Sequence, residues 1–298
     1  MSRVPATSST RRAFLHRTAA AAGAGVGLSL TRLSSAAGQG QFAGEIRKAV
    51  KYHMVQGDGL SVRDKFQLLK DLGFDGVEIR SVDRVDPDEA VRARDETGLP
   101  IHGVINSNSP LIREAVDLSK KYGGDSVLVV AGRVNQEMSY DANYREWLGR
   151  LRENAPYAEE QGIQLLVENV WNNFLLSPLE MARFIDEVDS PAVGVYFDVG
   201  NVVRYGWPEQ WVRILGHRIG KLDIKEYSRK LEQDEGIRKG FQVEIGDGDV
   251  NYPALLEALA EIGYSGWATA EVPGGDRERL AEIARRMDVA LDLKTAAE

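Results

Sequence analysis

Short runs of β-branched and aromatic residues alternate with amphipathic stretches eight times between residue 49 and the C-terminal region. Apolar residues with a period near two predict strands, and a period near 3.6 predicts helices. The predicted strands are 49–55, 76–80, 101–106, 126–131, 164–169, 193–199, 219–227 and 266–272. A helical stretch follows each strand, and this order predicts parallel strands joined by crossover helices.

Capping residues and glycines mark the ends of the predicted helices. The expected N-terminal caps are Ser61, Asp86, Ser109, Ser177 and Asn251. Glycines close helices just before the next strand at Gly73, Gly98, Gly162 and Gly263. Eight units of about 30 residues each favour a closed (β/α)8 TIM barrel, of the α/β class, over an open sheet. An open nucleotide-binding sheet would more often carry a glycine-rich phosphate motif, and neither GxGxxG nor GxxxxGK[ST] is present.

The first 37 residues have the layout of an export leader. Arg11 and Arg12 precede an apolar run rich in Ala and Gly at 19–30, and small residues follow as far as Ala37. This order predicts a twin-arginine signal peptide over residues 1–37 and a single barrel domain over residues 38–298. We therefore expect export to the periplasm, with a tether if the leader is not cleaved. After cleavage no stable membrane insertion is expected.

Charge and cysteine content narrow the classes of function. The chain has a net charge of −8, and removal of residues 1–37 leaves 32 Lys and Arg against 45 Asp and Glu. Such an acidic chain argues against nucleic acid as a partner. The sequence contains no cysteine, which excludes disulfides, thiolate nucleophiles and zinc sites built from cysteine.

Acidic residues end the fifth to eighth predicted strands: Glu168, Asp198, Asp223 and Glu271. In a TIM barrel the C-terminal strand ends carry the chemistry. One such acid is explained equally well by a structural ion pair. Four that converge on one rim repel each other strongly unless a cation lies between them. Their oxygens therefore predict a site for one divalent metal ion.

Several segments resemble the xylose isomerase-like TIM barrels, a family that includes sugar isomerases, epimerases and myo-inosose dehydratase. The resemblance covers about residues 50–286. It is carried by GFDGVEI at 73–79, VEN at 167–169, FDVGN at 197–201, DIKE at 223–226, GDG at 246–248 and GYSG at 263–266. It implies a Mn2+, Mg2+ or Co2+ ion held by Glu168, Asp198, residue 223 and Glu271.

The chain departs from this family at two positions. Where the family commonly has a histidine ligand, this chain has Asp223, and an all-oxygen site favours Mg2+ or Mn2+ over Zn2+. Asn201 stands where many members carry a histidine that contacts the substrate. An asparagine can hydrogen-bond a hydroxyl group but cannot carry a proton at neutral pH.

The resemblance implies a divalent-metal-dependent sugar isomerase or epimerase that acts through an enediolate. A cation polarises the carbonyl, and two carboxylates, for which Glu168 and Glu271 are the candidates, remove and return a proton. Two alternatives stay open: a metal-dependent lyase or dehydratase acting on keto-sugars or 3-keto-glycosides, and a sugar-binding barrel without catalysis. The expected partner is a small carbohydrate, and a homo-oligomer is compatible with the sequence.

Other polar side chains are expected where a sugar would meet the strand ends. The candidates for substrate binding are His53, Glu78, Asn106, Trp171, Asn201 and Lys225. Lys225 lies two residues after Asp223 and is therefore expected on the same face of its strand. His53 is favoured over His102, which lies near the start of its strand, at the end of the barrel that serves stability. The charged segment 228–240 is interpreted as a solvated loop or a lid.

Overall fold

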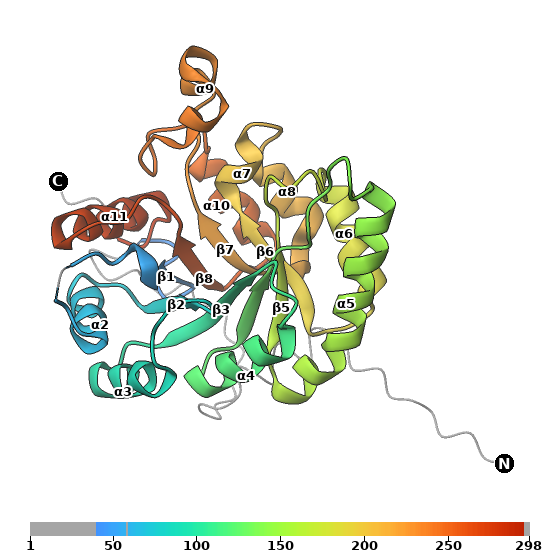
Figure 1. The fold of residues 1–298 in the computed structure, drawn as a ribbon. Coiled ribbons are helices and arrows are strands. Elements are labelled where there is room, and N and C mark those ends of the chain that lie inside the picture. Colours follow the sequence, from blue (N-terminus) through green and yellow to red (C-terminus); the bar gives the residue numbers. More distant parts are fainter. Residues whose placement is uncertain (1–39, 58, 295–298) are drawn as a thin grey trace, which may run out of the picture.

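The strands form a closed parallel barrel that runs in order from β1 to β8 (Figure 1). The computed structural model describes residues 40–57 and 59–294, so the leader predicted at 1–37 lies outside them. The strands are β1 (Ile46–Lys51), β2 (Gly76–Arg80), β3 (Ile101–Ser107), β4 (Ser126–Val129), β5 (Gln164–Glu168), β6 (Val193–Asp198), β7 (Ile219–Ile224) and β8 (Gly266–Ala270). The predicted (β/α)8 barrel is confirmed.

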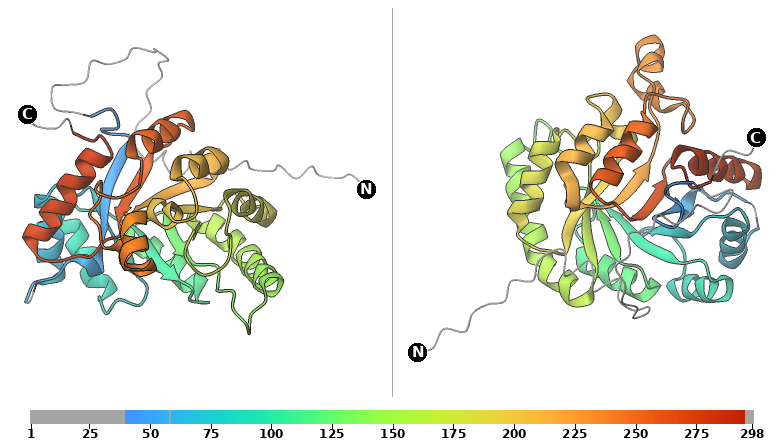
Figure 2. Two further views of the ribbon diagram at one scale, coloured as in Figure 1. Left: turned by 90° about the horizontal axis from the view of Figure 1, so that it is seen from above. Right: turned by 180° about the vertical axis from the view of Figure 1, so that it is seen from behind.

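Helices surround the barrel as an outer ring, and Figure 2 shows α9 projecting beyond that ring. The α-helices are α2 (Val62–Asp71), α3 (Pro87–Thr97), α4 (Ile112–Tyr122), α5 (Tyr140–Gln161), α6 (Pro178–Val188), α7 (Val199–Val203), α8 (Pro208–Leu215), α9 (Arg229–Glu235), α10 (Tyr252–Glu261) and α11 (Arg277–Ala290). Short 3-10 turns are η1 (Tyr52–Met54), η2 (Gly216–Arg218) and η3 (Ile237–Phe241). In the part of the chain that the structure describes, every helix is too short or too polar to cross a membrane.

Most predicted helix starts are confirmed by their caps. Ser61 and Asp64 form a reciprocal capping box at the start of α2, and Asp86, Ser177 and Asn251 accept a backbone hydrogen bond at α3, α6 and α10. The expected cap at Ser109 is wrong, because α4 begins at Ile112 without a side-chain cap. Ser109 Oγ instead accepts a hydrogen bond from the Leu111 amide before the helix begins.

The predicted limits of most strands differ from the observed ones, and those of β1, β4, β7 and β8 differ by two residues or more. The first was predicted at 49–55, but β1 begins at Ile46 because it pairs along its length with β8, and the chain turns into η1 directly after Lys51. Strands β4, β7 and β8 end at Val129, Ile224 and Ala270, earlier than predicted. The apolar residues that follow these strands pack without joining the ladder, so periodicity alone does not show where pairing stops.

The barrel interior contains a small apolar cluster and a buried polar network beside it. Ile105, Leu128, Leu166 and Tyr196 form a compact cluster on one side. The polar network begins at the Tyr196 hydroxyl. This group donates a hydrogen bond to Glu78 Oε2 at 3.1 Å and lies 2.9 Å from Thr269 Oγ1. The barrel interior therefore holds buried polar groups as well as packed apolar side chains.

The network continues to the opposite end of the barrel through His102. Its Nε2 lies 3.2 Å from Thr269 Oγ1, and its Nδ1 lies 2.9 Å from Lys221 Nζ. The imidazole also stacks on Trp267 with 4.5 Å between ring centroids. Burial, and then the charge of Lys221, lower the pKa of His102 well below its ordinary value. The ring is therefore neutral, and it is a structural group of the barrel interior.

Candidate metal centre

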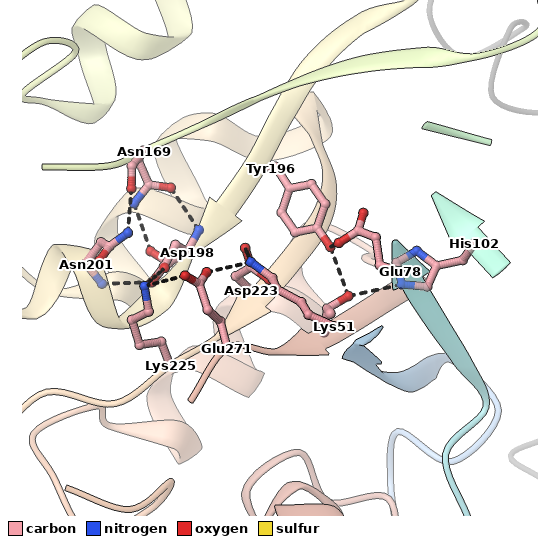
Figure 3. Close-up of polar contacts among 11 residues, drawn as sticks. Lys51, Glu78, His102, Asn169, Tyr196, Asp198, Asn201, Asp223, Lys225 and Glu271 are labelled. Carbon is pink, nitrogen blue, oxygen red and sulfur yellow. Dashed lines mark hydrogen bonds and ion pairs between the residues drawn. The ribbon is translucent and has the colours of Figure 1, made fainter. Parts of the chain in front are cut away.

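Carboxylates from four neighbouring strands meet at the C-terminal end of the barrel, and Figure 3 shows those of Asp198, Asp223 and Glu271. One oxygen from each of Glu168, Asp198, Asp223 and Glu271 can be chosen so that all lie within 4.8 Å of one another. Glu168 and Asp198 end β5 and β6, Asp223 lies in β7, and Glu271 follows β8 directly. Parallel strands bring these ends to one rim, and the structure gathers the four predicted ligands there.

Two asparagines fix Asp198 in place (Figure 3). The Asn169 side chain accepts a hydrogen bond from the Asp198 amide and donates one to the Asp198 carbonyl, both at 2.8 Å. Asp198 Oδ1 accepts from the Asn201 amide at 2.8 Å, and Asn201 Nδ2 donates to the Asn169 carbonyl at 3.0 Å. These contacts leave Oδ2 of Asp198 as the atom that faces the other acids.

Gly200 lets α7 pack against the end of β7. A Cβ atom at this position would lie 2.8 Å from the carbonyl carbon of Lys225, closer than side-chain atoms normally approach backbone. A larger residue would push α7 and the strand end apart and move Asp198 relative to Lys225. The glycine of the FDVGN segment is therefore explained by this close approach.

Two lysines, one at the end of β1 and one directly after β7, lie among the four acids. Lys51 Nζ donates to Asp223 Oδ2 at 2.9 Å and to Glu271 Oε2 at 2.6 Å. Lys225 Nζ lies 3.2 Å from Asp198 Oδ2 and 3.1 Å from Glu271 Oε1. The structure thus brings Lys225 to the cluster, as its spacing from Asp223 suggested. Lys51 was missed because the first strand was predicted to continue to residue 55, which placed Lys51 well before the strand end.

The arrangement of charges and lone pairs fits one divalent metal ion. Four carboxylates face two ammonium groups, which leaves a formal excess of two negative charges. Asp223 Oδ1 and Asp198 Oδ2 are buried, and neither accepts a hydrogen bond from any described residue. The ion pair of Asp198 Oδ2 with Lys225 lacks hydrogen-bond geometry. Burying an oxygen that accepts no hydrogen bond costs free energy. Carboxylate oxygens are suitable ligands for Mg2+ or Mn2+, which would satisfy them.

The environment shifts the pKa values of the four acids in opposite directions. Burial, and then the charge of Glu271, raise the pKa of Glu168 to about 8. Burial also raises the pKa of Asp198 and, more strongly, that of Asp223. Burial acts in the same direction on Glu271, but its ion pairs with Lys51 and Lys225 outweigh it and hold the pKa of Glu271 well below its ordinary range. Glu271 is therefore ionised at neutral pH.

We expect metal affinity to rise with pH up to about pH 8. Glu168 holds a proton below its pKa of about 8. A carboxylate must release its proton to bind a metal, so Mg2+ binding at pH 7 should release at least about one proton. Calorimetric titration with Mg2+ in buffers of different protonation enthalpy measures this release. Affinity that stays constant between about pH 6 and about pH 8 would contradict the shift. Glu168→Gln, which cannot titrate there, is the matched control.

The other predicted substrate contacts lie at different depths. Glu78 is fully buried beneath the cluster, and one of its oxygens lacks a hydrogen-bond partner among the described residues. Asn106 is also buried and accepts a hydrogen bond from Ser81 Oγ at 2.8 Å. His53 lies on η1 with an exposed side chain, and its pKa is lowered by partial burial and then by Arg80. His53 therefore lies near the rim, whereas His102 is buried in the barrel interior.

Aromatic residues border the cluster on the side of Lys225. Trp171 Nε1 donates to the Asn201 carbonyl at 2.8 Å, and its ring lies 4.8 Å from that of Phe241. Lys225 Nζ lies 5.4 Å from the centroid of Phe241, so this wall continues directly from the charged groups. Tyr205, on the outer side of Trp171, is 64% exposed. Trp171 and Asn201 are therefore neighbours of the acids.

The segment 228–240 is folded as a short helix and a 3-10 turn. Helix α9 has no buried residue among those described. It is held to the barrel by the ion pair of Glu232 with Arg204 at 3.2 Å and by hydrogen bonds from Arg229 to the carbonyls of Val203 and Gly206. The predicted loop or lid is thus a partly helical arm anchored on the segment after α7.

The fold and the acids define a TIM barrel with a candidate metal centre at the C-terminal ends of its strands. The chain belongs to the xylose isomerase-like TIM barrel family, whose model matches residues 66–291. The family suggested by the sequence segments is confirmed.

Curated relatives carry names from sugar and sugar-acid chemistry. The 2-oxo-tetronate isomerase of Pectobacterium atrosepticum is 28% identical over 177 residues, which are 56% of this chain and 62% of the relative. The inosose dehydratase of Mesomycoplasma hyopneumoniae is 27% identical over 135 residues, 41% of this chain and 44% of the relative. The chain spans about half the length of the curated relatives it matches.

A solved structure with the same fold is the D-allulose 3-epimerase from Methylomonas sp.. Its TM-score is 0.67 at 19% sequence identity, and the superposition covers 86% of this chain and 100% of that chain. At this identity the likeness shows the shared barrel.

Proposed function

We propose that this chain is an enzyme that isomerises or epimerises a sugar or a sugar-like hydroxy-carbonyl compound by moving a proton at the carbon next to the carbonyl. One divalent ion, Mg2+ or Mn2+, would be held by Glu168, Asp198, Asp223 and Glu271. The observation that carries this proposal is the gathering of four carboxylates and two lysines within one strand-end cluster. The related isomerase, dehydratase and epimerase support the carbohydrate substrate class.

When bound, the metal ion supplies polarisation of the substrate carbonyl and makes the adjacent proton more acidic. The ionised Glu271 carboxylate takes that proton, and its side chain is 32% exposed, so a substrate in the barrel mouth reaches it. Lys225, with a side chain 18% exposed, donates a hydrogen bond to a substrate oxygen that gains negative charge. Glu168, the second carboxylate of the pair, takes up a proton from solvent and delivers it to carbon, while Glu271 releases its proton to solvent.

A lyase or dehydratase is the second candidate, and the inosose dehydratase among the relatives favours it. Both reactions begin with abstraction of the same proton. They differ in the next step, because elimination needs an acid at the leaving group, whereas isomerisation returns the proton to carbon. We also propose that the chain is exported, since residues 1–37 have the layout of a twin-arginine leader. Export would favour substrates without a phosphate group.

The test is solvent exchange in D2O. The Mg2+-loaded protein is incubated with pooled aldoses, ketoses and 3-keto-glycosides, and NMR follows deuterium at the carbon next to the carbonyl. We expect incorporation that stops when a chelator removes the metal. An isomer as product would establish the isomerase or epimerase, and an unsaturated sugar would establish the lyase. If sugars bind but no carbon exchanges, a sugar-binding barrel without catalysis replaces the proposal.

A further inference from the structure

Lys51 bridges two of the four acids, Asp223 and Glu271, from the end of β1, the strand that pairs with β8 to close the barrel. It is the last residue of β1 and is 4% exposed. Its Nζ lies 2.9 Å from Asp223 Oδ2 and 2.6 Å from Glu271 Oε2, so a single ammonium group joins the acids of β7 and β8 (Figure 3). This contact orients both carboxylates by charge-assisted hydrogen bonds.

The same contact divides the two oxygens of Asp223 between different tasks. Oδ2 accepts a hydrogen bond from Lys51, whereas Oδ1 is buried and has no donor among the residues that the structure describes. A carboxylate with one oxygen occupied in this way offers a metal ion one ligand atom. Lys51 therefore limits Asp223 to a single free oxygen.

Lys51 also sets the fixed charge that a bound ion must balance. With four carboxylates, Lys51 and Lys225, the cluster has a formal charge of −2, which one divalent cation neutralises. Without Lys51 the formal charge would be −3. Unlike charges a few ångströms apart in a buried site interact by several kcal/mol. One unit of charge is therefore enough to change which cation the cluster prefers.

We propose that Lys51 is a positioning residue that makes the cluster selective for a single divalent ion over a trivalent one. The inference rests on the proposed function, because it concerns the same metal site. Lys51 would act through Asp223 and Glu271, because an ammonium group has no lone pair with which to bind a metal ion. Its positive charge offsets the negative charge that Asp223 adds to the cluster.

The test compares the affinities of the full chain for Tb3+, by luminescence, and for Mn2+, by calorimetry. In Lys51→Met the ratio of Tb3+ to Mn2+ affinity should rise at least about tenfold, because the formal charge becomes −3. The ratio of affinities is the readout because protonation of an unpaired Asp223 would weaken the binding of both ions together. Lys51→Arg keeps the charge and should stay within about threefold of wild type.

Two further variants separate selectivity from damage to the fold. Lys51→Met with Asp223→Asn returns the formal charge to −2, so the ratio should return close to wild type. Asp223→Asn alone has a formal charge of −1 and should shift the ratio at least about tenfold toward Mn2+, which decides the question if Lys51→Met does not fold. Lys48→Met removes a buried lysine of β1 that pairs with Asp288 and should leave the ratio unchanged.

The outcomes distinguish this inference from the proposed function. If wild type binds Mn2+ but the ratio is the same in Lys51→Met, or in Asp223→Asn where Lys51→Met does not fold, the selectivity role is wrong and the metal site stands. If the double variant keeps the ratio of Lys51→Met, the charge balance is not the cause and the inference falls. If wild type binds neither ion, both the inference and the proposed metal-dependent reaction are overturned.

Discussion

Glu271→Gln is expected to lower the rate of deuterium exchange by at least about 10³-fold, because the variant loses the base and one metal ligand together. Glutamine keeps the size of the side chain but carries no negative charge and accepts no proton at neutral pH. Exchange measured by NMR in D2O at saturating Mg2+ gives the rate. A reduction of less than about tenfold would assign proton abstraction to another residue.

The fold of this variant should be preserved because each lysine keeps another carboxylate. Lys51 retains Asp223 at 2.9 Å, and Lys225 retains Asp198 at 3.2 Å. The matched control is Glu282→Gln on α11, where the carboxylate pairs with Arg285 and Arg286 away from the cluster. The control should change the exchange rate less than about twofold, in line with other exposed substitutions.

Lys221→Met is expected to lower the free energy of unfolding by about 3 kcal/mol, although it lies outside the metal cluster. Lys221 is 2% exposed and donates to the His102 carbonyl at 2.7 Å, and its Nζ lies 2.9 Å from His102 Nδ1. Burial raises the pKa of Glu78, and the charge of Lys221 acts in the opposite direction. Methionine fills the space but leaves these buried polar groups without their partner. Urea unfolding followed by circular dichroism measures the change.

An exposed lysine gives the comparison for this prediction. Lys120 Nζ donates to the Gln161 carbonyl at 2.8 Å in an exposed contact. Lys120→Met should lower the free energy of unfolding by less than about 1 kcal/mol, because water replaces the lost donor. Equal losses in the two variants would show that burial of Lys221 contributes nothing beyond one hydrogen bond.

The acids of the candidate site could be found from the sequence because each has a local signal. Glu168, Asp198 and Asp223 each interrupt or end an apolar strand, and Glu271 follows one. In parallel strands that alternate with helices, such positions reach the same rim. The same reasoning found Lys225, two residues from Asp223. It also overextended strands β1, β4, β7 and β8, because apolar residues continue beyond the last paired residue.

The sequence by itself determined the barrel, the set of acids at the strand ends and most of the helix ends that caps and glycines mark. These features depend on residue periodicity, caps and glycines, which act over a few neighbouring positions. Only the tertiary structure decided that Lys51 lies among the acids, since Asp223 is 172 positions away along the chain. That contact depends on closure of the barrel by β1 and β8. The energy of a charge pair depends on distance in space, which local sequence patterns do not contain.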